Sequence, residues 1–245
     1  RFIGVSGEAL GLAHLPDSVF QPPMDMNVVE AAVRDRIRAK FGASRHMTIG
    51  RVAVLTRDMP GRTACHYCGP CQRGCITRSY FSSLTATLPA ARATGRLTLR
   101  PDSIVHTVVY DPAHGRVSGV RVIDAQTRTE QEFGARVVFL CASALESVRI
   151  LFNSRSSTVS DGLANGSGAL GRGIMDHIKN GGAGGTIPGF LDRTTVGARP
   201  NGILVPRFRN LSAATRQPSF IRGYQMQGGA GRGGWQSSAL PGAVR

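Results

Sequence analysis

The sequence has 245 residues, of which 41% are hydrophobic, and a formal charge of +15 from 30 lysine and arginine residues against 15 aspartate and glutamate residues. No run of about 18 apolar residues occurs, which excludes an ordinary membrane-spanning helix within this sequence. The positive charge is almost all arginine and is dispersed, so we expect a solvated basic surface and no nucleic-acid partner.

The first predicted elements are a helix and a strand. Residues 1–26 contain several prolines and are expected to form a loop. Asn27 is followed three residues later by Glu30, a capping-box pattern that predicts a helix over 28–41. The apolar residues of 47–55 predict a strand.

Four of the five cysteines lie in the stretch CHYCGPCQRGC, residues 65–75. They are Cys65, Cys68, Cys71 and Cys75. Their spacing matches the run whose thiolates bind iron–sulfur clusters in bacterial ferredoxins. Ile76 stands where that run has a proline, and no second run of cysteines follows. An iron–sulfur cluster on these four cysteines is therefore one hypothesis among several.

Three other interpretations of this stretch stay open. A zinc site would need a strained wrap or a distant fourth ligand, with His66 nearby, because structural zinc sites normally combine two separated ligand pairs. Disulfides would require an oxidising compartment and a restricted geometry. A tight glycine-rich turn with reduced, half-buried cysteines is the remaining alternative.

The next segment, residues 97–133, is predicted to form a β-meander. Its expected strands cover 97–100, 104–110, 116–123 and 129–133. A turn with Pro112 and Gly115 separates the second and third of them.

A continuous apolar run, residues 137–142, predicts a strand buried on both faces, as in a parallel sheet. Cys141 would then be a core residue. The small residues 142–144 lead into a predicted helix over 145–152. Such a strand–turn–helix unit brings backbone N–H groups to the sheet edge where nucleotides bind, although an ordinary connection is the alternative.

Glycine becomes frequent beyond residue 153, and Asp176 and His177 form an acid–histidine pair in a glycine-rich turn. Neighbours in sequence usually point apart, so local hydrogen bonding or a ligand contact is favoured over a catalytic dyad. The sequence contains no Walker loop, no G-x-S-x-G elbow and no G-x-G-x-x-G after a strand.

Six segments, in this order, carry a family resemblance. They are CHYCGPCQRGC (65–75), LTLRPDSIVHTVVYD (97–111), GRVSGVRVID (115–124), ARVVFLCASALESVRILFNS (135–154), GALGRGIMDH (168–177) and RPNGILVPRFRNL (199–211). Together they resemble the glucose–methanol–choline (GMC) family of FAD-dependent oxidoreductases. The resemblance is strongest to bacterial members that act as dehydrogenases on sugars or other alcohols.

The resemblance implies an α/β fold with α+β character. Residues 1–178 would form part of an FAD-binding, Rossmann-like domain with the meander inserted in it. Residues 179–245 would begin a substrate-binding domain and be partly disordered.

The resemblance also implies which residues line the cofactor. Val105 would lie against the adenine end of FAD, and Ala142 and Ser143 would lie beside the dinucleotide. Asp176 and His177 would lie near the flavin-binding region.

The implied reaction is oxidation of a CH–OH group of an alcohol or sugar by hydride transfer to flavin. The family's opening glycine motif and its active-site histidine segment have no counterpart here. We therefore expect an internal fragment, inactive by itself, with the catalytic histidine in the missing C-terminal region.

The resemblance also suggests an electron acceptor and a location for the protein. In some family members an iron–sulfur cluster in the cysteine region relays electrons from FAD to a cytochrome, so a cytochrome subunit is one candidate acceptor. The expected location is the cytoplasm or periplasm of a bacterium. Two alternative functions stay open: an iron–sulfur electron-transfer module without flavin, and a basic, cysteine-rich nucleic-acid-binding protein.

Overall fold

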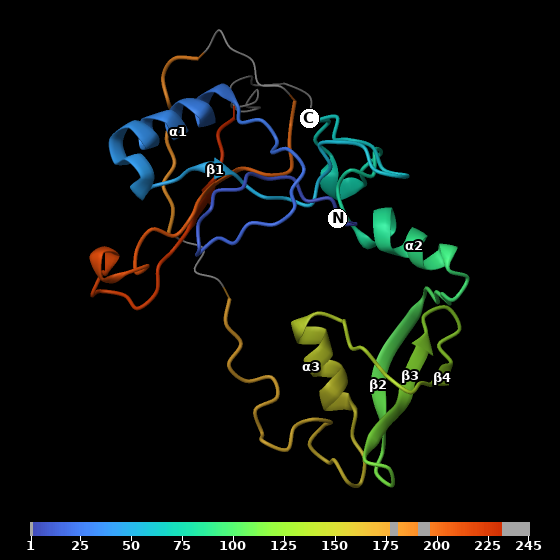
Figure 1. The fold of residues 1–245 in the computed structure, drawn as a ribbon. Helices are drawn as coiled ribbons and strands as arrows, with labels where there is room; N and C mark the ends of the chain where they lie inside the picture. The colour runs from blue at the N-terminus through green and yellow to red at the C-terminus, as the bar shows by residue number, and fades with distance from the viewer. Residues whose placement is uncertain (1, 177–180, 191–196, 232–245) are drawn as a thin grey trace, which may run out of the picture. The chain divides into compact units, whose positions relative to one another are not determined.

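The structure is a computed structural model that describes residues 2–176, 181–190 and 197–231. The chain divides into two compact units (Figure 1): unit 1 comprises residues 1–97 and 185–245, and unit 2 comprises residues 98–184. These two units are defined by contacts within the chain. The predicted domains, 1–178 and 179–245, are defined by the ligands they would bind, so the predicted division into domains stays a prediction. Part of the segment expected to be disordered, 232–245, lies outside the described residues.

The main helix of unit 1 is α1, Val28–Phe41, and it confirms the prediction for 28–41. The side chain of Asn27 accepts hydrogen bonds from the backbone N–H groups of Val29 and Glu30, at 3.1 and 3.0 Å. The Glu30 carboxylate accepts the N–H of Asn27 at 3.0 Å in return. This reciprocal capping satisfies N–H groups that a helix start otherwise leaves unpaired.

A small antiparallel sheet lies beside this helix in unit 1, with its strands in the order β1–β5–β6. These strands are β1 (Thr48–Ile49), β5 (Ile203–Val205) and β6 (Met226–Gly228). The strand predicted over 47–55 is therefore present only at its start. Beyond it, the N–H of Val54 bonds to the carbonyl of Val52, a local contact that bends the chain, and isolated bridges to Ser6 and Tyr80 replace a ladder.

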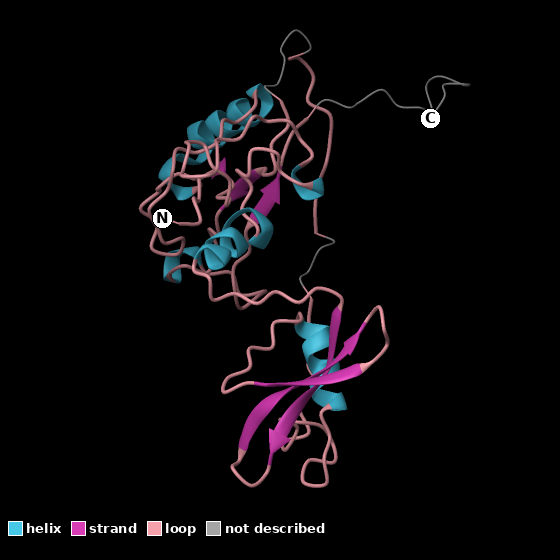
Figure 2. Cartoon of the chain, turned by 90° about the vertical axis from the view of Figure 1, so that its right-hand side faces the viewer, coloured by secondary structure: helices cyan, strands magenta, loops and turns pink. Residues whose placement is uncertain are grey.

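The core of unit 1 is built on Met24, Ile49 and Val54, with Leu55 fully buried as well. Short helical elements complete the unit (Figure 2). They are a 3₁₀ turn at Gly42–Ser44, a 3₁₀ turn at Cys71–Arg73, a π turn at Ser83–Thr87, helix α2 at Leu88–Ala93 and a 3₁₀ turn at Ala213–Thr215.

The described residues of unit 2 form three consecutive antiparallel strands and one helix (Figures 1 and 2). They are β2 (Ser103–Asp111), β3 (Arg116–Asp124), β4 (Glu130–Gly134) and α3 (Ala144–Asn153). Strands stand where 104–110, 116–123 and 129–133 were predicted, and α3 covers the helix predicted over 145–152. The helix packs against β2, and Ser154, which follows it, accepts the N–H of Val108 at 2.8 Å.

Two predicted strands are wrong. Residues 97–100 and 137–142 form no ladder. Val137 and Phe139 are 67% and 85% exposed, and Cys141, expected in the core, is exposed too. An apolar run becomes a buried strand only when neighbouring strands pair with it, and no strand in the described part of the chain does so. The described helices include none that is long and apolar enough to cross a membrane.

Gly119 in β3 allows β4 to approach closely. A Cβ at this position would lie 2.2 Å from the backbone oxygen of Phe133. We expect Gly119→Ala to loosen the β3–β4 pairing and to destabilise unit 2 by about 1–3 kcal/mol, as overpacking does. Urea unfolding followed by circular dichroism measures this loss. Gly134→Ala is the matched control, since its Cβ would meet only the Ser118 oxygen, at 3.9 Å, and an equal effect of both changes would contradict the explanation.

Candidate functional site

Unit 2 holds the predicted cofactor-binding residues that the structure describes. Val105 lies half-buried in β2, opposite Val122 of β3. Ala142 and Ser143 lie directly before α3, the helix that packs against β2. Asp176 is exposed near the end of the unit. His177 lies outside the described residues.

Ser143 adopts an unusual backbone conformation at the start of α3. Its φ is 72°, in the region that favours glycine, and a non-glycine residue there costs on the order of 1–3 kcal/mol. Its side chain makes no capping hydrogen bond to α3. Backbone N–H groups at such a helix start can receive an anionic group such as a phosphate. The one acidic residue of that first turn, Glu146, is paired with Arg149 at 2.6 Å.

The four cysteines of the stretch 65–75 all lie in unit 1. Cys65 packs beside the hydrophobic core and accepts the N–H of Tyr67 at 3.4 Å. Cys68 is exposed, and its backbone forms a bridge with Ala198. Cys71 begins a 3₁₀ turn.

The sulfur of Cys75 lies within hydrogen-bonding distance of Thr77, Ser79 and Tyr80. Within the described ranges, no three His, Cys, Asp or Glu side chains gather to hold a metal ion. All five cysteines are free thiols. The structure therefore gives no support to the iron–sulfur hypothesis for Cys65, Cys68, Cys71 and Cys75, because these thiols form no such group of ligands among the described residues.

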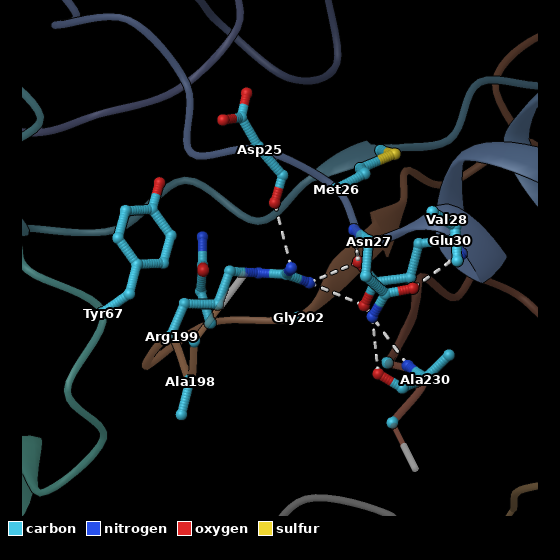
Figure 3. Close-up of a pocket in the computed structure, with 14 residues that line it drawn as sticks. Asp25, Met26, Asn27, Val28, Glu30, Tyr67, Ala198, Arg199, Gly202 and Ala230 are labelled. Carbon is cyan, nitrogen blue, oxygen red and sulfur yellow. Dashed lines mark hydrogen bonds and ion pairs between the residues drawn. The ribbon is translucent and has the colours of Figure 1, made fainter. Parts of the chain in front are cut away.

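A cavity of about 400 Å³ in unit 1 was not predicted (Figure 3). It is lined by the start of α1 and by residues that precede or follow the strands of the small sheet. Arg199 crosses it: its Nη2 lies 2.6 and 2.5 Å from the two carboxylate oxygens of Glu30, and its Nη1 donates to the backbone oxygen of Asp25 at 3.0 Å. A charge-assisted contact of this kind, from one guanidinium nitrogen to both carboxylate oxygens, is stronger than a neutral hydrogen bond.

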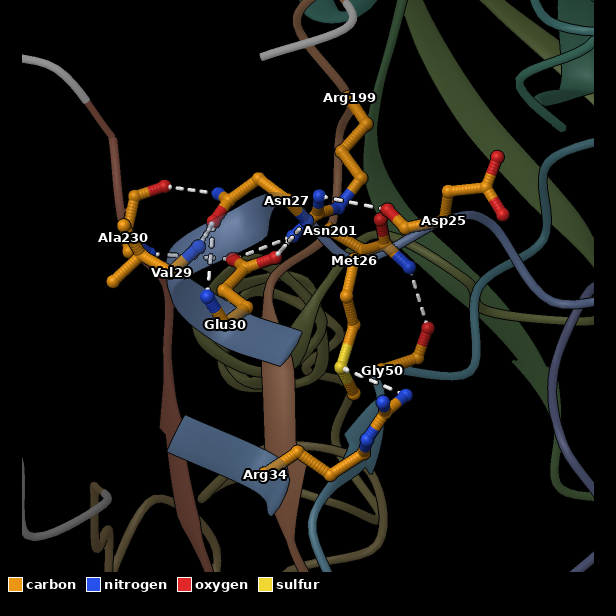
Figure 4. Close-up of polar contacts among 10 residues, drawn as sticks. All are labelled: Asp25, Met26, Asn27, Val29, Glu30, Arg34, Gly50, Arg199, Asn201 and Ala230. Atoms are coloured by element: carbon orange, nitrogen blue, oxygen red, sulfur yellow. Dashed lines mark hydrogen bonds and ion pairs between the residues drawn. The ribbon is translucent and has the colours of Figure 1, made fainter. Parts of the chain in front are cut away.

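The same carboxylate connects the capping box to the chain after β6 (Figure 4). Glu30 is 2% exposed and also accepts the N–H of Ala230 at 3.2 Å. The side-chain amide of Asn27 donates to the Ala230 carbonyl at 2.7 Å. A charge this deeply buried needs its partners, so the cluster fixes the wall of the cavity.

Two buried polar atoms of the cavity wall have no hydrogen-bond partner among the described residues. They are the Nε of Arg199, a donor, and the Oδ1 of Asn201, an acceptor. Both atoms are buried, so their hydrogen-bonding capacity is unused within the described part of the chain. The capping motif pointed to Glu30 as a helix cap only, and nothing local in the sequence pointed to Arg199 as its partner.

The family profile of the GMC oxidoreductases matches residues 33–179, which is more than half of the chain. The chain belongs to the GMC oxidoreductase family. This confirms the resemblance that the sequence motifs indicated.

Two curated relatives align with about half of this GMC family member. A 2-methyl-1,2-propanediol dehydrogenase of Mycolicibacterium austroafricanum is 32% identical over 126 residues, which are 51% of this chain and 22% of that protein. A 6'''-hydroxyparomomycin C oxidase of Streptomyces lividus is 30% identical over 130 residues, which are 49% of this chain and 22% of that protein. The chain thus aligns with about a fifth of the length of these relatives.

The GMC match covers some candidate residues and omits others. It includes the cysteine stretch and every predicted cofactor residue, from Val105 to His177. It excludes Glu30 and Arg199, which form the wall of the cavity. Membership in the family therefore bears on the predicted cofactor residues more directly than on the cavity.

Proposed function

We propose that this chain is part of an FAD-dependent oxidoreductase that oxidises the CH–OH group of an alcohol or sugar. The observation that carries the proposal is the GMC oxidoreductase match over residues 33–179. The names of the two relatives, a diol dehydrogenase and an oxidase of a hydroxylated compound, support an alcohol-type substrate.

The residues proposed to hold FAD lie mainly in unit 2. Val105 of β2 would contact the adenine end, and Ala142 and Ser143 would contact the diphosphate. The open N-terminus of α3 fits this role, because its N–H groups carry no side-chain cap and favour negative charge. Asp176 and His177 would lie near the flavin. When bound, FAD supplies the hydride acceptor, and the protein supplies binding and orientation.

These residues bind and orient, and we assign none of them to proton transfer. Ser143 directly precedes the first turn of α3, so its backbone conformation decides where the N–H groups point. Val105 would offer a half-buried strand surface to the adenine ring.

The complete protein should carry flavin absorption near 450 nm, and Ser143→Asp should weaken FAD binding by about tenfold or more. The added carboxylate would occupy the N–H groups of α3 and repel a diphosphate, while aspartate is itself an acceptable cap, so the helix should persist. Flavin retained on dialysis measures the loss. Ser157→Asp, at an exposed serine of the same unit, is the control.

A complete protein that carries no flavin would refute the proposed function. Flavin retained equally by both variants would instead refute only the role of α3. Turnover of alcohols and sugars with oxygen or with an artificial dye then separates an oxidase from a dehydrogenase.

A further inference from the structure

The loop that joins β5 to β6 in unit 1 is long, and all of its charged residues are arginines (Figure 1). It covers residues 206–225, and its arginines are Arg207, Arg209, Arg216 and Arg222. Loops between antiparallel neighbours usually have about two to five residues, and loops longer than about 12–15 residues are usually functional or disordered. The side chain of Asn210 holds this loop in one shape, because it donates to the Phe220 carbonyl at 2.9 Å and accepts the N–H of Gln217 at 2.7 Å. An ordered loop of this length points to a function.

Aromatic rings connect the β5–β6 loop to the end of α1. The centre of the Phe208 ring lies 5.5 Å from that of Tyr224, which lies 5.9 Å from that of Phe220. The guanidinium carbon of Arg45, shortly after α1, lies 4.0 Å from the centre of the Phe208 ring and 5.6 Å from that of Phe41. Cation–π contacts of this kind are attractive. The loop and the end of the helix therefore form one continuous surface within unit 1.

This surface gathers cations without counter-charges. The ammonium of Lys40 lies 5.5 Å from the centre of the Phe41 ring. The side chain of Arg207 packs on Gly223, where an added Cβ would lie 2.3 Å from it. None of its cations forms an ion pair with another described residue. We define the basic surface by its five cations, which are Lys40, Arg45, Arg207, Arg209 and Arg222.

Large apolar side chains are exposed on the same surface. Ile221 is 94% exposed and stands in sequence between Phe220 and Arg222. Tyr224 and Phe41 are 48% and 43% exposed. Single exposed apolar residues are normal on a protein, whereas a group of them surrounded by polar residues marks an interaction site. Basic residues combined with exposed aromatic and aliphatic side chains are typical of segments that lie in a membrane interface.

We propose that the basic surface binds membranes that contain anionic phospholipids. The arginines would pair with the lipid phosphates, and Ile221 would enter the boundary between headgroups and acyl chains. Each cation close to an anionic membrane strengthens binding about fivefold, and the effect ends within about one Debye length. This inference goes beyond the proposed oxidoreductase function and does not depend on it.

The exposed side chains favour a membrane over other anionic partners. Single-stranded nucleic acids stack their bases on free aromatic faces, but the guanidinium of Arg45 lies over the Phe208 ring. Ile221 offers no such face at all. An acidic protein surface would match the charges, but it would place carboxylates against the exposed Ile221 side chain.

The experiment is flotation of the complete protein with lipid vesicles in a density gradient. Vesicles of equal parts phosphatidylcholine and phosphatidylglycerol should bind the protein at low ionic strength and release it at about 1 M salt, where the Debye length is about 3 Å. Vesicles of phosphatidylcholine alone should not retain it. The double variant Arg209→Gln with Arg222→Gln should weaken binding about thirtyfold. Ile221→Ala should weaken it at least about fourfold, which is the value of one buried CH₂ group.

Two control variants make the same chemical changes elsewhere in unit 1. Arg92→Gln with Arg96→Gln removes two exposed arginines from α2 and the residues after it, which Figure 1 shows apart from the β5–β6 loop. Leu84→Ala shortens a side chain that is 79% exposed. Both controls should leave vesicle binding within about twofold of the unchanged protein. All of the substituted side chains are exposed, so circular dichroism should show no loss of structure.

Four results would overturn the proposal. The complete protein could bind neither kind of vesicle, or bind both equally. The two double variants could weaken binding by the same factor, which would leave only a general effect of net charge. Ile221→Ala could be without effect. A DNA duplex or polyglutamate could bind more tightly than the anionic vesicles, which would assign the surface to a nucleic acid or an acidic protein. Flavin content, measured on the same samples, tests the oxidoreductase function separately.

Discussion

Replacing Arg199 by alanine should lower the free energy of unfolding of unit 1 by about 3–5 kcal/mol. Glu30 is 2% exposed and the Arg199 side chain 12% exposed, so the variant would leave a buried carboxylate without its counter-charge. The Glu30 carboxylate also caps α1 and accepts the N–H of Ala230. If the carboxylate moved in the variant, both of these hydrogen bonds would weaken. Urea unfolding, with amide hydrogen exchange in α1 as a local probe, measures the effect.

Two further variants separate the ion pair from other causes. Arg34→Ala removes the exposed partner of Asp35 and should cost less than about 0.5 kcal/mol, since exposed pairs contribute little. The double variant Glu30→Gln with Arg199→Met keeps the capping acceptor and removes both charges, and should recover most of the loss. If Arg199→Ala costs no more than Arg34→Ala, the buried pair does not stabilise unit 1.

Replacing Leu55 by alanine should destabilise unit 1 by about 2–5 kcal/mol. Leu55 is 0% exposed, and its side chain occupies the space beside Gly4 so fully that a Cβ on Gly4 would lie 2.1 Å from its Cδ2. Its backbone also bonds to Cys65 and Ser79, at 2.9 and 3.1 Å. The cost arises from lost apolar burial and from the cavity that remains.

The matched control for Leu55→Ala is Leu84→Ala, at a leucine that is 79% exposed and should change stability by less than about 0.5 kcal/mol. Leu55→Met, which nearly conserves volume, should cost less than about 1.5 kcal/mol. Chemical unfolding of the three variants under one set of conditions ranks them. Equal losses at the buried and exposed leucines would show that Leu55 is not a core residue.

Local patterns in the sequence predicted the elements that close within a few residues. The helix α1 follows from the capping pair Asn27 and Glu30, which lie three residues apart. Strands β2 and β3 follow from apolar residues flanking a turn at Pro112 and Gly115, and pair as neighbours in sequence. The ordered motifs likewise sufficed to identify the GMC family.

Contacts between segments that are distant in sequence decided which apolar residues are buried and what surrounds each cysteine. Residues 137–142 have the composition of a buried strand, but without a neighbouring ladder they remain exposed. The cysteine spacing alone could not show that Cys65 packs on a core while Cys75 lies beside the hydroxyls of Thr77 and Ser79.

The sequence by itself determined the capped helix, the strands of unit 2 and the family, because hydrogen bonds and side-chain periodicity within short segments specify them. Only the tertiary structure decided that Arg199 pairs with Glu30, 169 residues away, and that the two of them line a cavity. Nothing in the local pattern of either residue encodes that pairing. It forms because the fold brings the start of α1 and the residues before β5 together around one cavity, in a place where neither charge could be buried alone.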